Sequence, residues 1–386
     1  AAVGVGSSTA ISVKLGQKDY RTAEELLGNT VTLNLIVGFC FSAICLIFLD
    51  PILYFFGASK DTIPYARSFM QIILCGNMIS HMYFGMNAVL RAASKPRQAM
   101  NATIFTVVMN ILLDVLFILV MHWGIRGAAF ATVISQTLAL VYQMKLFTNK
   151  SELLHLKKGI YGLKARLVKN IIAIGISPFL MNLCACLIII FINNQLVKYG
   201  GDLMVGAYGI ASAISTVFVM IIIGVNQGMQ PIAGYNYGAQ KIDRLLRVLK
   251  LAMITATVIM TTGWLIAMTL PHLLARIFTN DPSLIKIAVP AIRLNMLVFF
   301  IVGFQMVITN FFQCIGKVKI SIFLSLSRQL LFLLPLLYVF PLQFGVNGVW
   351  YAMPTSDFIA ATVAGVIMVL YMRKFKQQIK QSIHEN

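Results

Sequence analysis

Two aspartates lie inside long apolar stretches of this 386-residue chain. Asp114 occurs in MNILLDVLFI (109–118), and Asp357 follows MPTS (353–356). The other ten acidic residues lie in predicted loops, in the tail or at the ends of apolar stretches. An ionised carboxylate near the centre of a bilayer costs at least about 2.5–3.5 kcal/mol. If these stretches cross a membrane, each aspartate needs a partner or a wet cavity, and each is a candidate for function.

Polar side chains that can join Asp114 lie at helical spacing around it. Asn110 precedes it by four residues, so on a helix the two share one face. Asn87 lies near the inner end of the preceding apolar stretch, and Thr132 and Gln136 share a face of the following one. Carboxylate, amide and hydroxyl oxygens together can hold Na⁺, and the carboxyl can instead carry a proton. Such residues also serve as plain interhelical hydrogen-bonding groups, so ion binding and helix packing both remain open.

The second aspartate has a cationic candidate partner. Arg328 occurs in SLSRQLLF (325–332), near the inner end of its apolar stretch. Asp357 either lines a polar cavity or pairs with Arg328, whose long side chain can also reach the membrane surface. We therefore keep Gln136, Asp357 and Arg328 as candidate polar residues of a cavity.

The composition predicts that lipid covers much of this protein. The chain is 59% hydrophobic and 11% charged, whereas a soluble domain carries about 25% charged residues. A membrane-spanning helix needs about 20 apolar residues, and many uncharged stretches are that long. We predict an all-α polytopic membrane protein with spans near 1–14, 26–49, 63–88, 99–121, 125–147, 168–196, 204–235, 248–270, 286–312, 319–341 and 345–372.

The net charge of +19 is distributed as a membrane topology would require. Lys and Arg gather in every second predicted loop and in the tail after Arg373. Because cytoplasmic loops attract Lys and Arg, we expect the rich side and the C-terminus to be cytoplasmic. The charge then needs no nucleic-acid partner, and part of it attracts anionic lipid.

The residues that an intramembrane enzyme would need are not grouped in this sequence. All six cysteines fall within predicted spans and none shows metal-ligand spacing. There is no HExxH motif, no paired acid and no Ser-His constellation on neighbouring turns. We therefore predict a protein that is not an enzyme and that uses no cofactor and no structural metal.

The chain resembles itself at a spacing of about 222 residues. KLGQKDYR (14–21) matches NYGAQKIDR (236–244), and GIRGAAFA (124–131) matches GVNGVWYA (345–352). Internal repeats of this kind are common in secondary transporters. We predict an N-lobe helical bundle over 1–150, a cytoplasmic linker over 151–167, and a C-lobe bundle with a basic tail over 168–386. Comparing the halves predicts twelve spans, of which the first and part of the second are missing from this chain.

Several segments in the same order resemble the multidrug and toxic compound extrusion (MATE) family of transporters. They are GVNQGMQPIAGYNYGA, KIDRLLR, NAVLRAASKPRQAM, MNILLDVLFI, GIRGAAFATVISQ and SLSRQLLFLLPLLYVFP. The resemblance covers nearly the whole chain. It implies two pseudo-symmetric six-helix bundles around a central cavity, and export of cationic amphiphilic compounds against an inward flow of H⁺ or Na⁺.

The resemblance also implies roles for individual residues. The N-lobe cation site of the family uses an aspartate and an asparagine four residues earlier, which match Asp114 and Asn110. It also uses an asparagine and a hydroxyl on the flanking helices, which match Asn87 and Thr132. A further aspartate of that site belongs to a first helix that this chain lacks. Some members carry acids on the seventh and tenth helices, but the spans at 168–196 and 286–312 hold none, so we expect ion coupling in the N-lobe.

We therefore expect a monomeric antiporter of the inner (plasma) membrane that exports small cationic or amphiphilic compounds in exchange for H⁺ or Na⁺. A lipid-linked saccharide flippase of the same superfamily is the nearest alternative, and it would need a strongly cationic cavity. Only Arg293 and Arg328 are cations within spans. An intramembrane enzyme is a more distant alternative, and a channel would conduct ions without coupling.

Overall fold

The computed structural model describes residues 2–149 and 151–384, and every regular element in those ranges is a helix. The chain divides into two compact units, Ala1–Gly175 and Ile176–Asn386. The predicted linker, residues 151–167, belongs to the first unit. The boundary falls inside a long helix, α7 (Ala165–Gly200). Each unit is described by itself below.

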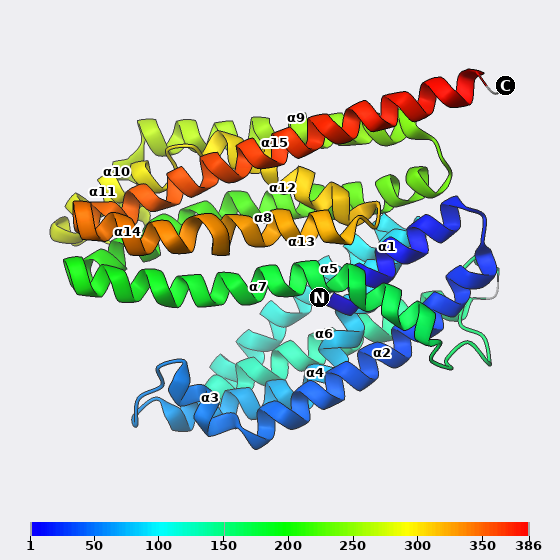
Figure 1. The fold of residues 1–386 in the computed structure, drawn as a ribbon. Helices are drawn as coiled ribbons and strands as arrows, with labels where there is room; N and C mark the ends of the chain where they lie inside the picture. The colour runs from blue at the N-terminus through cyan, green and yellow to red at the C-terminus, as the bar shows by residue number, and fades with distance from the viewer. Residues whose placement is uncertain (1, 150, 385–386) are drawn as a thin grey trace. The chain divides into compact units, whose positions relative to one another are not determined.

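The first unit is built around a long central helix, α4 (Ile63–Ala92). It packs against the helices before and after it in the chain (Figure 1). The other elements of this unit are α1 (Ala2–Gly16), α2 (Tyr20–Ile47), α3 (Leu49–Phe55), α5 (Pro96–Asp114), the π-helix η1 (Val115–Val120) and α6 (Gly124–Thr148). Because α1, α2, α5 and α6 all contact α4, polar groups on α4 can join groups from several helices.

The second unit has its core around α12 (Phe299–Cys314), which packs against α8, α9 and α15. Its other elements are the end of α7, α8 (Asp202–Gly238), α9 (Ile242–Thr269), α10 (Pro271–Phe278), α11 (Pro282–Asn295), α13 (Val318–Leu326), the π-helix η2 (Ser327–Leu333), α14 (Leu334–Phe344) and α15 (Val346–His384). The fully buried side chains Phe311 and Phe312 lie at the centre of this core.

The predicted spans correspond to helices of suitable length. Among the described residues, eight helices are long and apolar enough to cross a membrane, or nine if α11 and α12 form one span bent by 50°. That bent pair occupies the predicted span at 286–312. α5 continues into η1 as one span, and α13, η2 and α14 form another. The all-α fold of a polytopic membrane protein is confirmed.

The internal repeat is visible in the backbone. The helices α1, α2 and α3 end or begin 222 residues before their counterparts α8, α9 and α10. Left-handed residues recur at the same spacing: Lys18 and Gln240 have φ of 60° and 56°, and Ser94 and Gly316 have φ of 62° and 70°. These residues end helices, where a left-handed conformation turns the chain. The two halves therefore use the same turns between equivalent helices.

Candidate functional site

Asp114 is the last α-helical residue of α5, and the π-helix η1 begins directly after it. Its Oδ1 atom is buried and has no hydrogen-bond partner. Among the described residues, no cationic side chain forms an ion pair with it. Buried carboxylate oxygens are normally satisfied, and π-helical segments are frequent at functional sites. This carboxyl is therefore free to accept an ion.

Two of the predicted partners lie together one turn before Asp114. The Asn110 amide nitrogen donates to the Thr132 hydroxyl at 3.5 Å, which joins α5 to α6. The Thr132 hydroxyl in turn donates to the Ala128 carbonyl at 3.0 Å. The first of these bonds is at the long limit for a hydrogen bond. Both side chains can therefore exchange it for contacts to a bound cation.

Aromatic side chains pack beside this site where α6 comes close to η1. The Phe117 and Trp123 rings stack with centroids 5.1 Å apart, and Trp123 meets Phe130 edge to face at 5.8 Å. Gly127 allows the close approach, because a Cβ there would lie 3.0 Å from the Cβ of Phe117. The sequence analysis did not single out these residues, although Gly127 belongs to the repeated motif.

Asn87 lies apart from this group. Its amide nitrogen donates to the Ala99 carbonyl at 2.9 Å and to the Thr103 hydroxyl at 3.2 Å, and its oxygen accepts from Arg91. Thr103 is eleven residues before Asp114, which is about 16 Å along a helix. The expectation of one chamber containing all four groups is therefore wrong in its geometry for Asn87. Its hydrogen bonds instead tie the end of α4 to the start of α5.

Gln136 takes part in a second polar layer between α4 and α6. Its side-chain oxygen accepts a short hydrogen bond from Ser80. One turn away on α4, the Tyr83 hydroxyl accepts from Thr106 of α5 at 3.1 Å. We did not predict Ser80, Tyr83 or Thr106. The spacing of Thr106, Asn110 and Asp114, four residues apart, is the signal that would have found this polar stripe.

In the second unit, Arg328 and Asp357 form an ion pair. The Arg328 Nε atom lies 2.6 Å from an Asp357 carboxylate oxygen, with the two side chains 33% and 12% exposed. The Ser356 hydroxyl donates to the Arg328 carbonyl at 2.9 Å. Of the two expectations for Asp357, the structure shows the pairing. Arg328 lies in η2, so both charged residues identified within spans on α5 and its repeat counterpart adjoin a π-helix.

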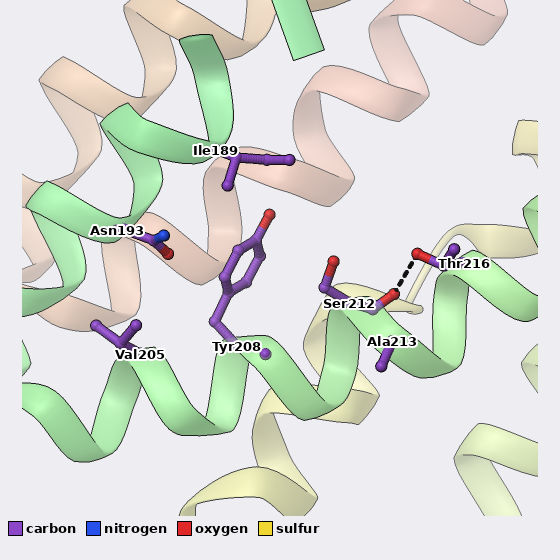
Figure 2. A pocket seen from close by; sticks show the side chains of 8 residues that line it. Ile189, Asn193, Val205, Tyr208, Ser212, Ala213 and Thr216 are labelled. Carbon is purple, nitrogen blue, oxygen red and sulfur yellow. Dashed lines mark hydrogen bonds between the residues drawn. The ribbon is translucent and has the colours of Figure 1, made fainter. Parts of the chain in front are cut away.

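A cavity of about 500 Å³ lies between α7 and α8 of the second unit (Figure 2). The Tyr208 ring projects into it, and the Asn193 side-chain oxygen is buried without a hydrogen-bond partner. The Thr216 hydroxyl donates to the Ser212 carbonyl at 2.8 Å along one wall. The lining residues carry no ionisable acid or base at neutral pH: Ile189, Asn193, Val205, Tyr208, Gly209, Ser212, Ala213 and Thr216. The sequence gave no signal for this cavity, because a tyrosine and an asparagine are unremarkable within a span.

Metal-binding chemistry has no support in the described part of the chain. No group of three or more His, Cys, Asp or Glu side chains is close enough together there to hold a metal ion. The six cysteines are free, and Cys184 and Cys314 are buried. Such thiols act as small packing residues.

A chain with many membrane-length helices, two units of matching helix order and an unpaired carboxyl inside a span has the architecture of a secondary transporter. The MatE family model matches residues 1–116 and 174–339, which is most of the chain. This chain belongs to the MATE family of multidrug transporters, and it is not an enzyme.

The relatives and solved structures agree with this family. The multidrug export protein MepA of Staphylococcus haemolyticus is 26% identical over 365 residues, covering 95% of this chain and 80% of the relative. The MepA of Staphylococcus aureus strain N315 is 24% identical over 367 residues, covering 95% and 81%. The MATE multidrug transporter DinF-BH in complex with R6G is 34% identical, with a TM-score of 0.87 over 95% of this chain and 82% of that one. An outward-facing multidrug resistance MATE transporter, 23% identical, shares the fold with a TM-score of 0.92 over 97% and 84%.

Proposed function

We propose that this protein is a secondary active antiporter that exports cationic or amphiphilic compounds in exchange for H⁺ or Na⁺. The observation that carries the proposal is the carboxyl of Asp114, which lies within a span and has a buried oxygen without a partner. A polar group in this position is costly unless an ion or a proton satisfies it. The adjacent Asn110 and Thr132 supply amide and hydroxyl oxygens that can complete a cation site.

Coupling follows from the two states of this carboxyl. With a proton or Na⁺ bound, Asp114 carries no net charge and favours one arrangement of its helices. Without the ion, it is a buried negative charge and favours an arrangement in which water reaches it. An ion shifts such an equilibrium only by its differential affinity for the two states. The bond of 3.5 Å between Asn110 and Thr132 is weak enough to break and re-form in each cycle.

The charges in the second unit support a cationic rather than an anionic substrate. Arg328 is neutralised by Asp357, so the pair adds no net positive charge to a cavity. A flippase for lipid-linked saccharides would need free cations for a pyrophosphate group. The cavity beside Tyr208 instead offers an aromatic face and the free oxygen of Asn193, and aromatic faces attract organic cations. The names of the relatives, multidrug export proteins, point the same way.

We further propose that the protein works as a monomer in the inner (plasma) membrane with its basic loops and C-terminus in the cytoplasm, without a cofactor and without a nucleic-acid partner. The support is the distribution of Lys and Arg along the sequence. The family, whose members are membrane transporters of small molecules, supports the same proposal.

The assignment of Asp114 is tested by efflux of a fluorescent lipophilic cation from cells that express the protein. We expect Asp114→Asn to lower the export rate at least tenfold, because an amide cannot take up and release H⁺ or neutralise Na⁺. Asp61→Asn is the matched control, since it removes the same charge from an exposed loop. If Asp114→Asn exports as fast as the wild type at equal expression, the assignment is wrong.

A further inference from the structure

A second large cavity lies in the first unit, where α1 ends and where α2 and α7 begin. Its volume is about 760 Å³. The residues that line it are Lys14, Asp19, Thr22, Glu25, Lys164, Arg166, Leu167, Lys169, Asn170 and Ala173. Unlike the cavity of Figure 2, it is lined by several charged side chains. Nothing in the proposed antiport uses this cavity.

The charges around this cavity do not cancel. Both acids are occupied: Asp19 lies 3.1 Å from Lys14, and Glu25 lies 2.6 Å from Lys164. The Thr22 side-chain hydrogen bond, with help from Lys14, lowers the pKa of Asp19, so that this acid stays ionised and paired at neutral pH. Two exposed cations of α7, Arg166 and Lys169, then remain without an ion pair. The cavity carries a net charge of about +2 once its internal pairs are counted.

The two unpaired cations occupy an unfavourable position on their helix. Arg166 and Lys169 are three residues apart near the start of α7, so they share one face. The first turn of a helix carries a partial positive charge that favours acids and anions, yet α7 has no acid there. The cations therefore repel the helix end and each other. A bound anion would relieve both repulsions.

The segment before α7 is held in place, so the site is built rather than loose. The Asn29 side chain of α2 donates to the Gly162 carbonyl at 3.1 Å and accepts from the Lys164 amide at 2.9 Å. The Thr32 hydroxyl donates to the Tyr161 carbonyl at 2.9 Å. These bonds fix the chain immediately before α7 against α2. The positions of the cations are thereby set by the fold.

The shape of the cavity indicates an amphipathic anion. Leu167, Asn170 and Ala173 line it at successive turns of α7, which carries it about 9 Å along the helix. α7 is a candidate membrane span, so the cavity runs from a basic end towards the apolar part of the bilayer. A small inorganic anion would fill only its basic end.

We propose that this cavity binds an anionic glycerophospholipid of the leaflet on the basic side, with the phosphate between Arg166 and Lys169. The acyl chains leave the cavity along Leu167 and Ala173. Because the site joins the start of α7 to α1 and α2, its lipid stabilises the cytoplasmic end of the first unit. This inference is independent of the ion coupled at Asp114.

The test is native mass spectrometry of the delipidated protein with phosphatidylglycerol, with phosphatidylcholine, and with phosphatidylglycerol in the presence of millimolar inorganic phosphate. We expect phosphatidylglycerol to bind at least tenfold more tightly than phosphatidylcholine, and inorganic phosphate not to displace it. Arg166→Gln/Lys169→Gln should lose at least tenfold in this affinity. The matched control is Arg244→Gln/Arg247→Gln, which removes two exposed cations with the same spacing near the start of α9, and it should stay within twofold.

Three results would overturn the proposal. Equal affinity for the two lipids would remove the role of the cations. An equal loss in both double variants would show diffuse attraction to the basic face rather than a site. Displacement of the lipid by inorganic phosphate would identify a site for free phosphate. The melting temperature of each lipid-free variant, which we expect to equal that of the wild type because the changed side chains are exposed, shows that the fold is intact.

Discussion

The two aspartates within spans differ in what neutralises them. Asp357 has an arginine at 2.6 Å, whereas Asp114 has a buried oxygen without a partner. A paired charge holds structure, because removing one partner leaves the other uncompensated. An unpaired carboxyl can change its charge by taking up an ion. The same residue type therefore has a structural role in one half of the repeat and a coupling role in the other.

The structural role of the ion pair predicts an asymmetric effect of mutation. Breaking a fully buried pair costs roughly 3–5 kcal/mol, and the 33% exposure of Arg328 reduces that cost here. We expect Arg328→Gln to destabilise the protein by about 2 kcal/mol. Asp357→Asn should cost less, since the charge that it leaves behind is the more exposed one.

The measurement is the melting temperature of the purified variants in detergent, with the double variant Arg328→Gln/Asp357→Asn as the control. The double variant should be more stable than Arg328→Gln, because it leaves no unpaired charge. Losses that simply add would show that the two side chains do not interact.

Two glycines of the repeated motif mark close approaches between equivalent elements. Gly127 of GIRG and Gly348 of GVNG align in the two halves. A Cβ on Gly348 would lie 2.3 Å from the backbone carbonyl of Phe340, and one on Gly127 would lie 3.0 Å from the Phe117 side chain. The motif is repeated because each half packs a helix start against the end of the preceding span. The closer approach lies in the second half.

These distances predict that Gly348→Ala is more damaging than Gly127→Ala. Overpacking costs about 1–3 kcal/mol, and a backbone neighbour at 2.3 Å cannot move aside as a side chain can. Thermal unfolding in detergent measures the difference. Gly224→Ala is the control: it has open space around it, and alanine favours a helix over glycine by about 1 kcal/mol. Equal stability of all three variants would contradict the packing argument.

The sequence predicted elements more fully than contacts. Uncharged stretches defined the spans, and the repeat at 222 residues predicted the matching helices, because length and polarity are local properties. The bend between α11 and α12 was missed, since its cause is a packing geometry rather than a composition. Asn110 and Thr132 do lie together, but Asn87 does not join them. Helical spacing fixes the face of a residue and leaves open its depth against neighbouring helices.

At the scale of the whole molecule, the distribution of Lys and Arg predicts an orientation in the membrane. Lys60 lies in a loop of the basic-poor side and Lys158 in the basic linker, and both are exposed. In a background without the six native cysteines, we expect Lys60→Cys to react with a membrane-impermeant maleimide in intact cells. Lys158→Cys should react only after lysis. Labelling of Lys158→Cys in intact cells would reverse the proposed topology.

Ion coupling at Asp114 is measured most directly in proteoliposomes that contain the purified protein and carry an imposed H⁺ or Na⁺ gradient. We expect one of these gradients to drive accumulation of a lipophilic cation by the wild type. Asp114→Asn should show no accumulation driven by either gradient, while still exchanging labelled for unlabelled cation at equilibrium. Gradient-driven accumulation by Asp114→Asn at the wild-type level would contradict the proposed role of this carboxyl.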